Sequence, residues 1–203
     1  MYYGTREPFG YYICAACDTL QIIDVLEGEE LRRHYPQNYC TYNIPSKPWV
    51  LRWLTTQHDR FELHTGGRPV VGALMAALVS ENIVPYVIGD AANAVRILGQ
   101  LAIERDARIL DVGCGGGALL DRLARVGFSN LSGADPFIEA DDETPQGVPL
   151  MKRYLSEVTG EFDLIMFNHS LEHVPDPVAT LKAAYGRLAA GGICLVRLPT
   201  TSS

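Results

Sequence analysis

The sequence predicts an α/β protein in which an open, mainly parallel sheet carries helices on both faces. An apolar, β-prone run at 108–112 is followed by four glycines within five residues and then by a helical pattern. Strand-like and helix-like segments alternate from there to about residue 200. The composition, 47% hydrophobic with a mean hydropathy of +0.03, fits a globular protein with a core. These observations indicate a Rossmann-like fold of five strands, preceded by a small β/loop appendage.

Length and charge bound the organisation of the 203 residues and the classes of partner. We expect a Tyr/Cys-rich appendage at 1–45, a helical cover region at 46–104 and the core at 105–203. The net charge of −7 argues against a nucleic-acid surface, which is normally basic. No apolar run approaches the roughly 20 residues of a membrane span, and the first residues do not resemble a signal peptide. Five cysteines, an odd count, favour a reducing cytoplasm over a disulfide framework.

The appendage has its most informative residues at Cys14 and Cys17, a Cys-x-x-Cys spacing between two strand-like runs. Two thiolates at this spacing bind one zinc ion from a single turn, and His34 and Cys40 could complete four ligands. The competing interpretation is a hairpin with two thiols and no metal. A redox pair is a third alternative, although it would be expected to begin a helix.

The stretch from 31 to 43 is aromatic and polar, and its tyrosines either form the wall of an acceptor pocket or pack the appendage against the core. Helices are expected at about 47–61, 68–81 and 90–103, the last capped by Asp90. In the first of these, apolar residues recur at Trp49, Val50, Trp53, Leu54 and Phe61. His58 and His64 are expected to be surface or packing residues.

The core elements follow in regular order. We expect strands at 108–112, 131–135, 147–152, 161–168 and 193–199, with a solvated loop at 141–145. Helices are expected at 118–126 and from Asp176-Pro177 to Ala189, where Gly191-Gly192 would end the second one.

The glycine turn after the first of these strands is typical of a nucleotide-type site, because glycines let the backbone bend sharply and approach a ligand. Gly113-x-Gly115-x-x-Ala118 also matches the dinucleotide fingerprint, which by itself is weak evidence. Asp111 would repel a pyrophosphate, whereas S-adenosylmethionine has no phosphate and carries an ammonium and a sulfonium. The acid therefore favours S-adenosylmethionine over NAD; a glycine turn without a ligand is the remaining alternative.

Three strings together resemble the class I S-adenosylmethionine-dependent methyltransferases. They are Asp111 to Gly117, Ala134-Asp135-Pro136, and Phe162 to Ile165 continued by Leu171 to Asp176. The resemblance implies that the first string holds the methionine end of the cofactor, that Asp135 binds ribose, that Asn168 lies under the sulfonium and that Leu155 borders the adenine. The expected cofactor-binding residues are Asp111, Gly113, Cys114, Gly115, Gly117, Asp135, Pro136, Leu155 and Asn168.

The amino-terminal piece resembles a bacterial subset of these enzymes in which a small zinc-ribbon-like segment comes first. The chain departs from that pattern in two ways. A second upstream Cys-x-x-Cys is missing, and residue 203 falls after the fifth of seven expected strands. The fifth strand is then an exposed apolar edge. We expect either a fragment or a homo-oligomer whose second subunit covers the edge.

Methyl transfer is an in-line displacement, so the protein mainly aligns the methyl group and its acceptor. An oxygen or carbon acceptor also needs a base, and the candidates are His169, His173 and Glu172. An interior hydrogen-bonded role for His173 is equally compatible with the sequence. The leading hypothesis is O- or C-methylation of a small molecule or saccharide. The alternatives are a cofactor-binding module without turnover and an NAD-dependent enzyme.

Overall fold

The computed structural model describes residues 7–26, 28–34, 44, 47–80 and 91–199. Cys40, most of the tyrosine-rich stretch and the Asp90 cap lie outside these residues. In the described part of the chain, no helix is long and apolar enough to cross a bilayer. The helices and single 3₁₀ turns are α1 (Gly28–Arg32), α2 (Trp49–Glu62), α3 (Pro69–Ser80), α5 (Ala91–Gln100), α6 (Ala118–Arg125), η1 (Leu155–Glu157), η2 (Leu171–His173) and α7 (Pro177–Tyr185).

The strands form two sheets. A two-stranded antiparallel hairpin joins β1 (Tyr11–Ile13) and β2 (Leu20–Ile22). The main sheet has the order β5-β6-β4-β3-β7-β8, and all its pairs are parallel except β5 with β6. Its strands are β3 (Arg108–Val112), β4 (Asn130–Ala134), β5 (Asp142–Glu143), β6 (Pro149–Met151), β7 (Phe162–Asn168) and β8 (Leu188–Arg197).

The predicted α/β fold is confirmed, since strands alternate with helices and the sheet is open and mainly parallel. Two details differ. The segment expected as a solvated loop contributes β5, because Asp142 and Glu143 pair antiparallel with the edge of β6. The helix expected to reach Ala189 ends at Tyr185, and the two glycines expected to end it lie within β8 near a register shift.

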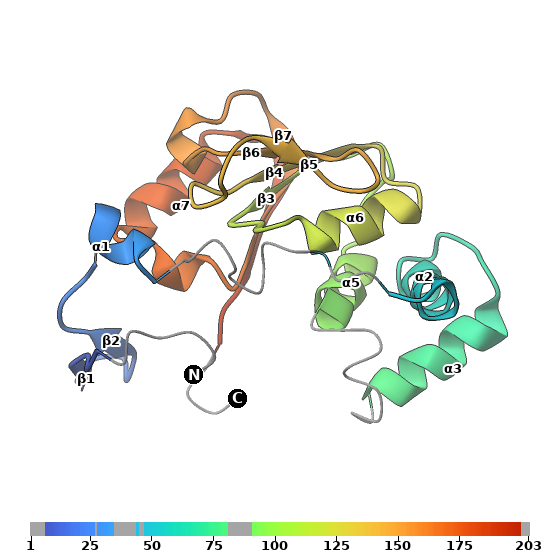
Figure 1. Cartoon of the computed structure of the whole chain (residues 1–203), viewed down its shortest axis with the longest axis horizontal. Coiled ribbons are helices and arrows are strands. Elements are labelled where there is room, and N and C mark those ends of the chain that lie inside the picture. The colour runs from blue at the N-terminus through green and yellow to red at the C-terminus, as the bar shows by residue number, and fades with distance from the viewer. Residues whose placement is uncertain (1–6, 27, 35–43, 45–46, 81–90, 200–203) are drawn as a thin grey trace.

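Side chains that alternate along the central strands separate two cores, one on each face of the sheet. Ile109, Leu164 and Met166 pack with α5 and α6, whereas Leu110 and Ile165 pack with α7 and η1. This period of two is expected for a strand buried on both faces. Figure 1 shows the hairpin and α1 at one end of the molecule and α2 with α3 at the other.

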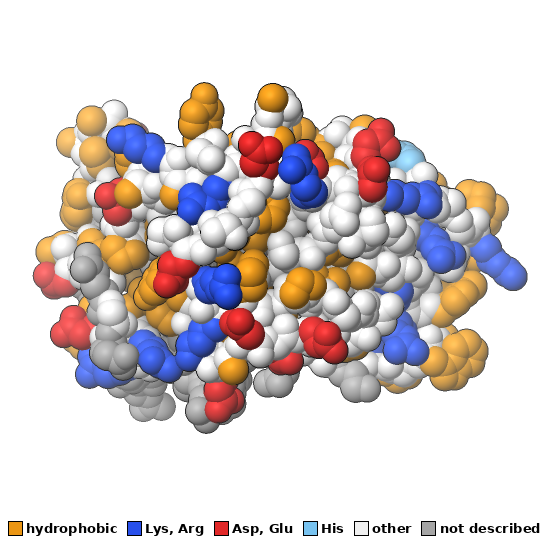
Figure 2. Space-filling model, turned by 90° about the horizontal axis from the view of Figure 1, so that it is seen from above, with side chains coloured by type: hydrophobic (Ala, Val, Ile, Leu, Met, Phe, Trp, Pro, Cys, Tyr) orange, Lys and Arg blue, Asp and Glu red, His pale blue; other side chains and the backbone are white. Residues whose placement is uncertain are grey.

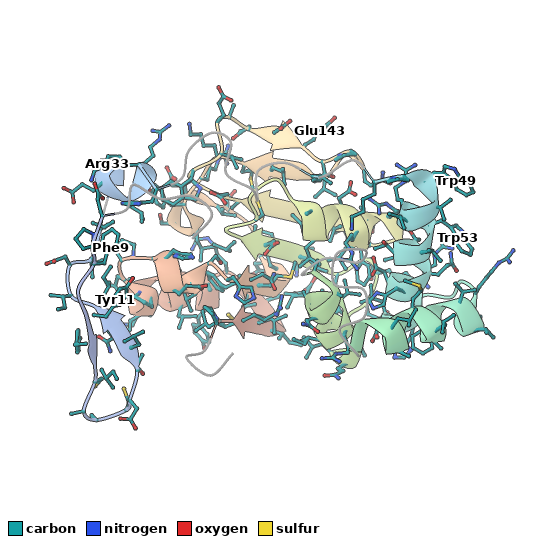
Figure 3. All side chains as sticks on the ribbon, turned by 60° about the horizontal axis from the view of Figure 1, so that its bottom comes forward. Phe9, Tyr11, Arg33, Trp49, Trp53 and Glu143 are labelled. Atoms are coloured by element: carbon teal, nitrogen blue, oxygen red, sulfur yellow. The ribbon has the colours of Figure 1, made fainter. Side chains whose placement is uncertain are left out.

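The side of α2 that faces α6 is polar, whereas Leu54 packs against the small cluster of Met75 and Ala92. Trp49 and Trp53 lie on the exposed side of α2 (Figure 3), where the guanidinium of Arg68 lies 6.0 Å from the centre of the Trp53 ring. Asp59 is instead buried, and both its oxygens accept hydrogen bonds from Arg122 of α6, at 2.9 and 2.5 Å. A buried charge is tolerated only when it is paired. This ion pair therefore determines which side of α2 faces inward.

The hairpin carries the predicted Cys-x-x-Cys at its turn. Cys17 is exposed, and its Sγ lies 3.2 Å from the Thr19 hydroxyl. Hydrogen bonds from Thr19, and then from Cys14, lower the pKa of the Cys17 thiol. Within the described ranges, no three or more potential ligands gather to hold a metal. The zinc prediction at Cys14 and Cys17 is therefore not supported by this part of the chain.

A cradle at the carboxyl edge of the sheet

The ends of β3, β4 and β7 open onto a cavity of about 1140 Å³. In an open parallel sheet, this edge is where ligands bind. The predicted site residues on its wall are Asp111, Gly113, Cys114, Asp135, Pro136, Leu155, Asn168, His169 and His173. Gly115, Gly117 and Glu172 were also predicted as site residues, but they do not line the cavity.

The glycine turn has little room for side chains. Gly113 has φ +76°, and a Cβ added there would lie 2.4 Å from Cβ of Ser170. Gly117 has φ +74°, and its added Cβ would meet Leu150 at 2.8 Å. L-residues rarely adopt such φ values, so the turn requires glycine at both positions for conformation and for space.

Asp135, directly after β4, braces the same turn. One carboxylate oxygen accepts a 2.9 Å hydrogen bond from the Gly115 N–H, and the other accepts a 2.8 Å bond from the Phe137 N–H. Burial raises the pKa of this carboxyl, while the two backbone N–H donors oppose the rise. An ionised carboxylate has about four acceptor sites, so Asp135 retains capacity for ligand hydroxyls.

Asp111 is buried inside β3 and belongs to a chain of three polar side chains. Nδ2 of Asn168 donates a 3.1 Å hydrogen bond to Oδ1 of Asp111, and Nη1 of Arg197 donates a 3.2 Å bond to Oδ1 of Asn168. Burial raises the pKa of Asp111 to about 7, and the nearby Asp135 adds to the rise, whereas Asn168 and Arg197 lower it. The ends of β3 and β4 thus place two carboxyl groups near one another in a desolvated site.

The three candidate bases lie together beyond β7. Oε1 of Glu172 is 4.0 Å from Nδ1 of His169 and 3.8 Å from Nε2 of His173. Both histidine side chains are about half exposed, and both line the cavity. The backbone of His169 has φ +55°, which is uncommon for this residue type and is often found at functional sites. One carboxylate can therefore orient either imidazole.

The sequence did not reveal two other residues of this edge. Ser170 donates a 2.6 Å hydrogen bond to the Val112 carbonyl and packs against Gly113, and Arg197 positions the Asn168 amide. Both follow or end a predicted parallel strand, and that position was the available signal. The amino end of α2 also reaches the cavity, through Arg52 and through Lys47, which precedes the helix.

The donor set fits a cationic ligand without phosphate. Asp111 and Asp135 place two carboxyl groups at the turn, and Ser170 fills the space behind Gly113. Burial raises the pKa of both carboxyls, and a bound cation would favour their ionised forms. A pyrophosphate there would be repelled by both acids, whereas an ammonium or sulfonium would be attracted. The residues therefore suit S-adenosylmethionine, and the apolar side chains of Leu155 and Pro136 also line the cavity.

The chain is similar in sequence to curated methyltransferases. The ubiquinone biosynthesis O-methyltransferase of Psychrobacter cryohalolentis is 35% identical over 102 residues, covering 44% of this chain and 39% of the relative. That of Xanthomonas campestris is 34% identical over 116 residues, covering 50% and 48%. The chain thus spans less than half the length of these curated relatives.

Similar solved structures include the sugar N-methyltransferase KedS8 from Streptoalloteichus, with a TM-score of 0.37, 20% identity and coverage of 46% of this chain and 41% of that one. The magnesium protoporphyrin IX methyltransferase of Synechocystis has a TM-score of 0.35, 15% identity and coverage of 73% and 63%.

A family model described as a methyltransferase domain matches residues 87–203, which is more than half of the chain. The matched range contains the glycine turn, Asp111, Asp135 and the histidines beyond β7. The chain therefore belongs to the methyltransferase domain family, within the class I S-adenosylmethionine-dependent methyltransferases that its motifs resemble.

Proposed function

We propose that this protein transfers the methyl group of S-adenosylmethionine to an oxygen or carbon of a small molecule or saccharide. The observation that carries the proposal is the pairing of an acidic cradle, Asp111 and Asp135, with the imidazoles of His169 and His173 on the wall of one cavity. The cofactor, when bound, supplies an electrophilic methyl group. The chain's own residues hold the cofactor, orient the acceptor and take up its proton.

His169 is our first choice for the base. Its ring is half exposed at the cavity wall, and its backbone N–H donates a 3.0 Å hydrogen bond to the Arg197 carbonyl, which fixes the residue against β8. Glu172 then acts as a positioning residue, because its carboxylate reaches both imidazoles and stabilises whichever one takes the proton. His173 is the second candidate, within the same reach of Glu172.

The cofactor half of the proposal is tested by calorimetric titration with S-adenosylhomocysteine and with NAD. We expect micromolar affinity for the first and none for the second. Binding of NAD without binding of adenosylhomocysteine would refute the assignment. The Gly113→Ala variant, whose new methyl group has no room beside Ser170, is expected to lose the binding.

The transfer half is tested by incubating the chain with isotopically labelled S-adenosylmethionine and panels of sugars, sugar phosphates and phenols. Labelled product that requires His169 or His173 supports transfer. Binding of adenosylhomocysteine with no labelled product in any panel favours the second candidate function, a cofactor-binding module without turnover. The feature that favours this alternative is the unpaired outer edge of β8 beside the site, within the residues that the structure describes.

A further inference from the structure

One wall of the cavity is built from the facing sides of two helices. On α2, Arg52 and Thr55 line the cavity, and Asp59 continues the same side one turn later. On α6, Arg122 and Arg125 lie three residues apart and also line it. Lys47 precedes α2 and completes the group. We call Lys47, Arg52, Arg122 and Arg125 the cationic wall.

Two acids lie beside these four cations, Asp59 on α2 and Asp121, which also lines the cavity. Arg122 is paired with the buried Asp59, and Arg125 is paired with Asp121, which also accepts a 3.1 Å hydrogen bond from the Gln146 N–H. Lys47 and Arg52 bring two further positive charges to the same wall. The wall is therefore cationic in a chain whose net charge is −7. On the outer face in Figure 2, by contrast, Lys and Arg are interspersed with Asp and Glu.

The cations on this wall are close enough to repel one another. Partial burial lowers the pKa of Lys47, and the positive charges of Arg122 and Arg125 lower it further, although Asp59 opposes them. An anion in the cavity would relieve the repulsion between these positive charges.

The amino end of α2 adds to this potential. Pro48 is its N-cap and makes no side-chain cap hydrogen bond, and the first turn contains no acid. The first N–H groups of a helix carry partial positive charge, and cations beside them are unfavourable unless an anion lies nearby. In the 14-residue α2, Lys47 and Arg52 occupy that unfavourable position and line the cavity.

We propose that the cationic wall is an anion subsite that holds a phosphate or carboxylate group of the methyl acceptor. The acceptor would therefore be acidic, such as a sugar phosphate or an aromatic acid. The inference rests on the proposed function for the identity of the ligand. Asp111 and Asp135 make the cofactor end acidic, so one cavity has an acidic end for a cationic cofactor and a basic wall for an anionic acceptor.

A second source of the same chemistry is the carboxylate of the cofactor itself. The test therefore titrates inorganic pyrophosphate into the 203-residue protein at low salt, with and without saturating S-adenosylhomocysteine. The variants are Lys47→Met and Arg52→Met. Arg60→Met is the matched control, because Arg60 lies on α2 but does not line the cavity.

We expect pyrophosphate to bind the adenosylhomocysteine-saturated protein. Its affinity should be at least tenfold weaker for Lys47→Met and for Arg52→Met, and unchanged for Arg60→Met. The affinity for adenosylhomocysteine should change less than twofold in all three variants, which also shows that they fold. Loss of pyrophosphate binding on saturation with adenosylhomocysteine would assign the wall to the cofactor and overturn the proposal. Equal weakening by all three variants, or no pyrophosphate binding at all, would also overturn it.

This design separates the subsite from the proposed function. If adenosylhomocysteine does not bind, the proposed function fails, while the titration of pyrophosphate into the ligand-free protein still reports on the wall. If adenosylhomocysteine binds and pyrophosphate does not, the proposed function stands and the acidic acceptor is refuted.

Discussion

Asn168 holds the carboxyl group of Asp111 by a 3.1 Å hydrogen bond between the ends of two neighbouring parallel strands. Arg197, at the end of the next strand, holds the other side of the same amide. The acid that the cofactor would meet is thus positioned by β7 and β8 as well as by its own strand. The protonation state of Asp111 should therefore affect both cofactor affinity and the stability of the folded protein.

Cofactor affinity should depend on the ionisation of Asp111. The pKa of this carboxyl is about 7 in the ligand-free protein, so it is mostly protonated at pH 6 and mostly ionised at pH 8. S-adenosylhomocysteine lacks the sulfonium charge but retains an ammonium group, which favours the ionised form of the carboxyl. We expect its affinity to rise up to about tenfold between these pH values. Calorimetry in buffers of different ionisation enthalpy would also show proton release. In Asp111→Asn the rise should disappear; a wild-type affinity independent of pH would contradict the assignment.

Ionisation of the Asp111 carboxyl should lower the free energy of unfolding at high pH. Its pKa is raised on folding, so its contribution to stability is full below the unfolded value near 3.8 and is lost as the pH rises through about 7. Asp111→Asn should therefore melt several degrees higher than wild type at pH 8, and the difference should shrink as the pH falls towards 5. Thermal melts in the absence of ligand test this, and a variant less stable than wild type at pH 8 would show that the carboxylate is not penalised.

Two glycines with the same backbone conformation separate strain from crowding. Gly113 and Gly147 both have φ +76°, but an added Cβ meets Ser170 at 2.4 Å in the first case and nothing within 4 Å in the second. We expect Gly147→Ala to cost about 1–2 kcal/mol for its backbone conformation. Gly113→Ala should cost about 1–3 kcal/mol more from overpacking. Urea unfolding measures both, and equal losses would mean that Ser170 moves aside easily.

The buried ion pair between Asp59 and Arg122 should be costly to break and cheap to replace. Arg122→Met removes the guanidinium partner of the buried carboxylate and leaves it beside the His58 imidazole, with an expected loss of about 3–5 kcal/mol. The double variant Asp59→Leu with Arg122→Met should recover most of that loss, because no charge remains buried. Burial opposes ionisation of Asp59, but hydrogen bonds from His58 and Arg122 hold its pKa below the usual value. A double-mutant cycle with no coupling would contradict the role of this pair in orienting α2.

The choice between the two imidazoles is testable by matched variants. His169→Gln should lower kcat by about 10²–10⁴-fold if His169 removes the acceptor's proton, while adenosylhomocysteine affinity stays within twofold. His173→Gln, equally exposed and equally near Glu172, is the control and should retain most activity. The reverse result would assign the base to His173. In Glu172→Gln, the positioning role predicts a shift in the pH–rate profile.

Most of the core and the cofactor cradle could be predicted from local sequence. The run Arg108–Val112 is an apolar strand that ends beside glycines, and φ values above +70° at Gly113 and Gly117 leave little alternative to that residue type. Asp176 followed by Pro177 gave the start of α7, where Asp176 accepts a hydrogen bond from the Ala179 N–H as expected of a cap. These features depend on neighbours in the chain.

The face of α2 could not be predicted in the same way. Apolar residues recur along this helix, but Trp49 and Trp53 are exposed, and the buried Asp59 pairs with Arg122, 63 residues away on α6. A prediction from hydrophobic periodicity places charged side chains in water. A buried ion pair is an exception, because each charge is compensated by its partner. The strand β5 was missed for a related reason, since Asp142 and Glu143 have no strand propensity and pair only because an edge is available.

The sequence by itself determined the order of the strands and helices, the glycine turn, the acids at the ends of β3 and β4 and the histidines beyond β7, because each is encoded within a few consecutive residues. Only the tertiary structure decided that Asn168 and Arg197 hold Asp111, that Ser170 closes on Gly113, and that Lys47 and Arg52 share a wall with α6. These relationships join residues dozens of positions apart. They form when parallel strands align their carboxyl ends and when a buried ion pair orients a helix. Residues that are adjacent in the chain do not indicate either contact, because its partners are far apart in the sequence.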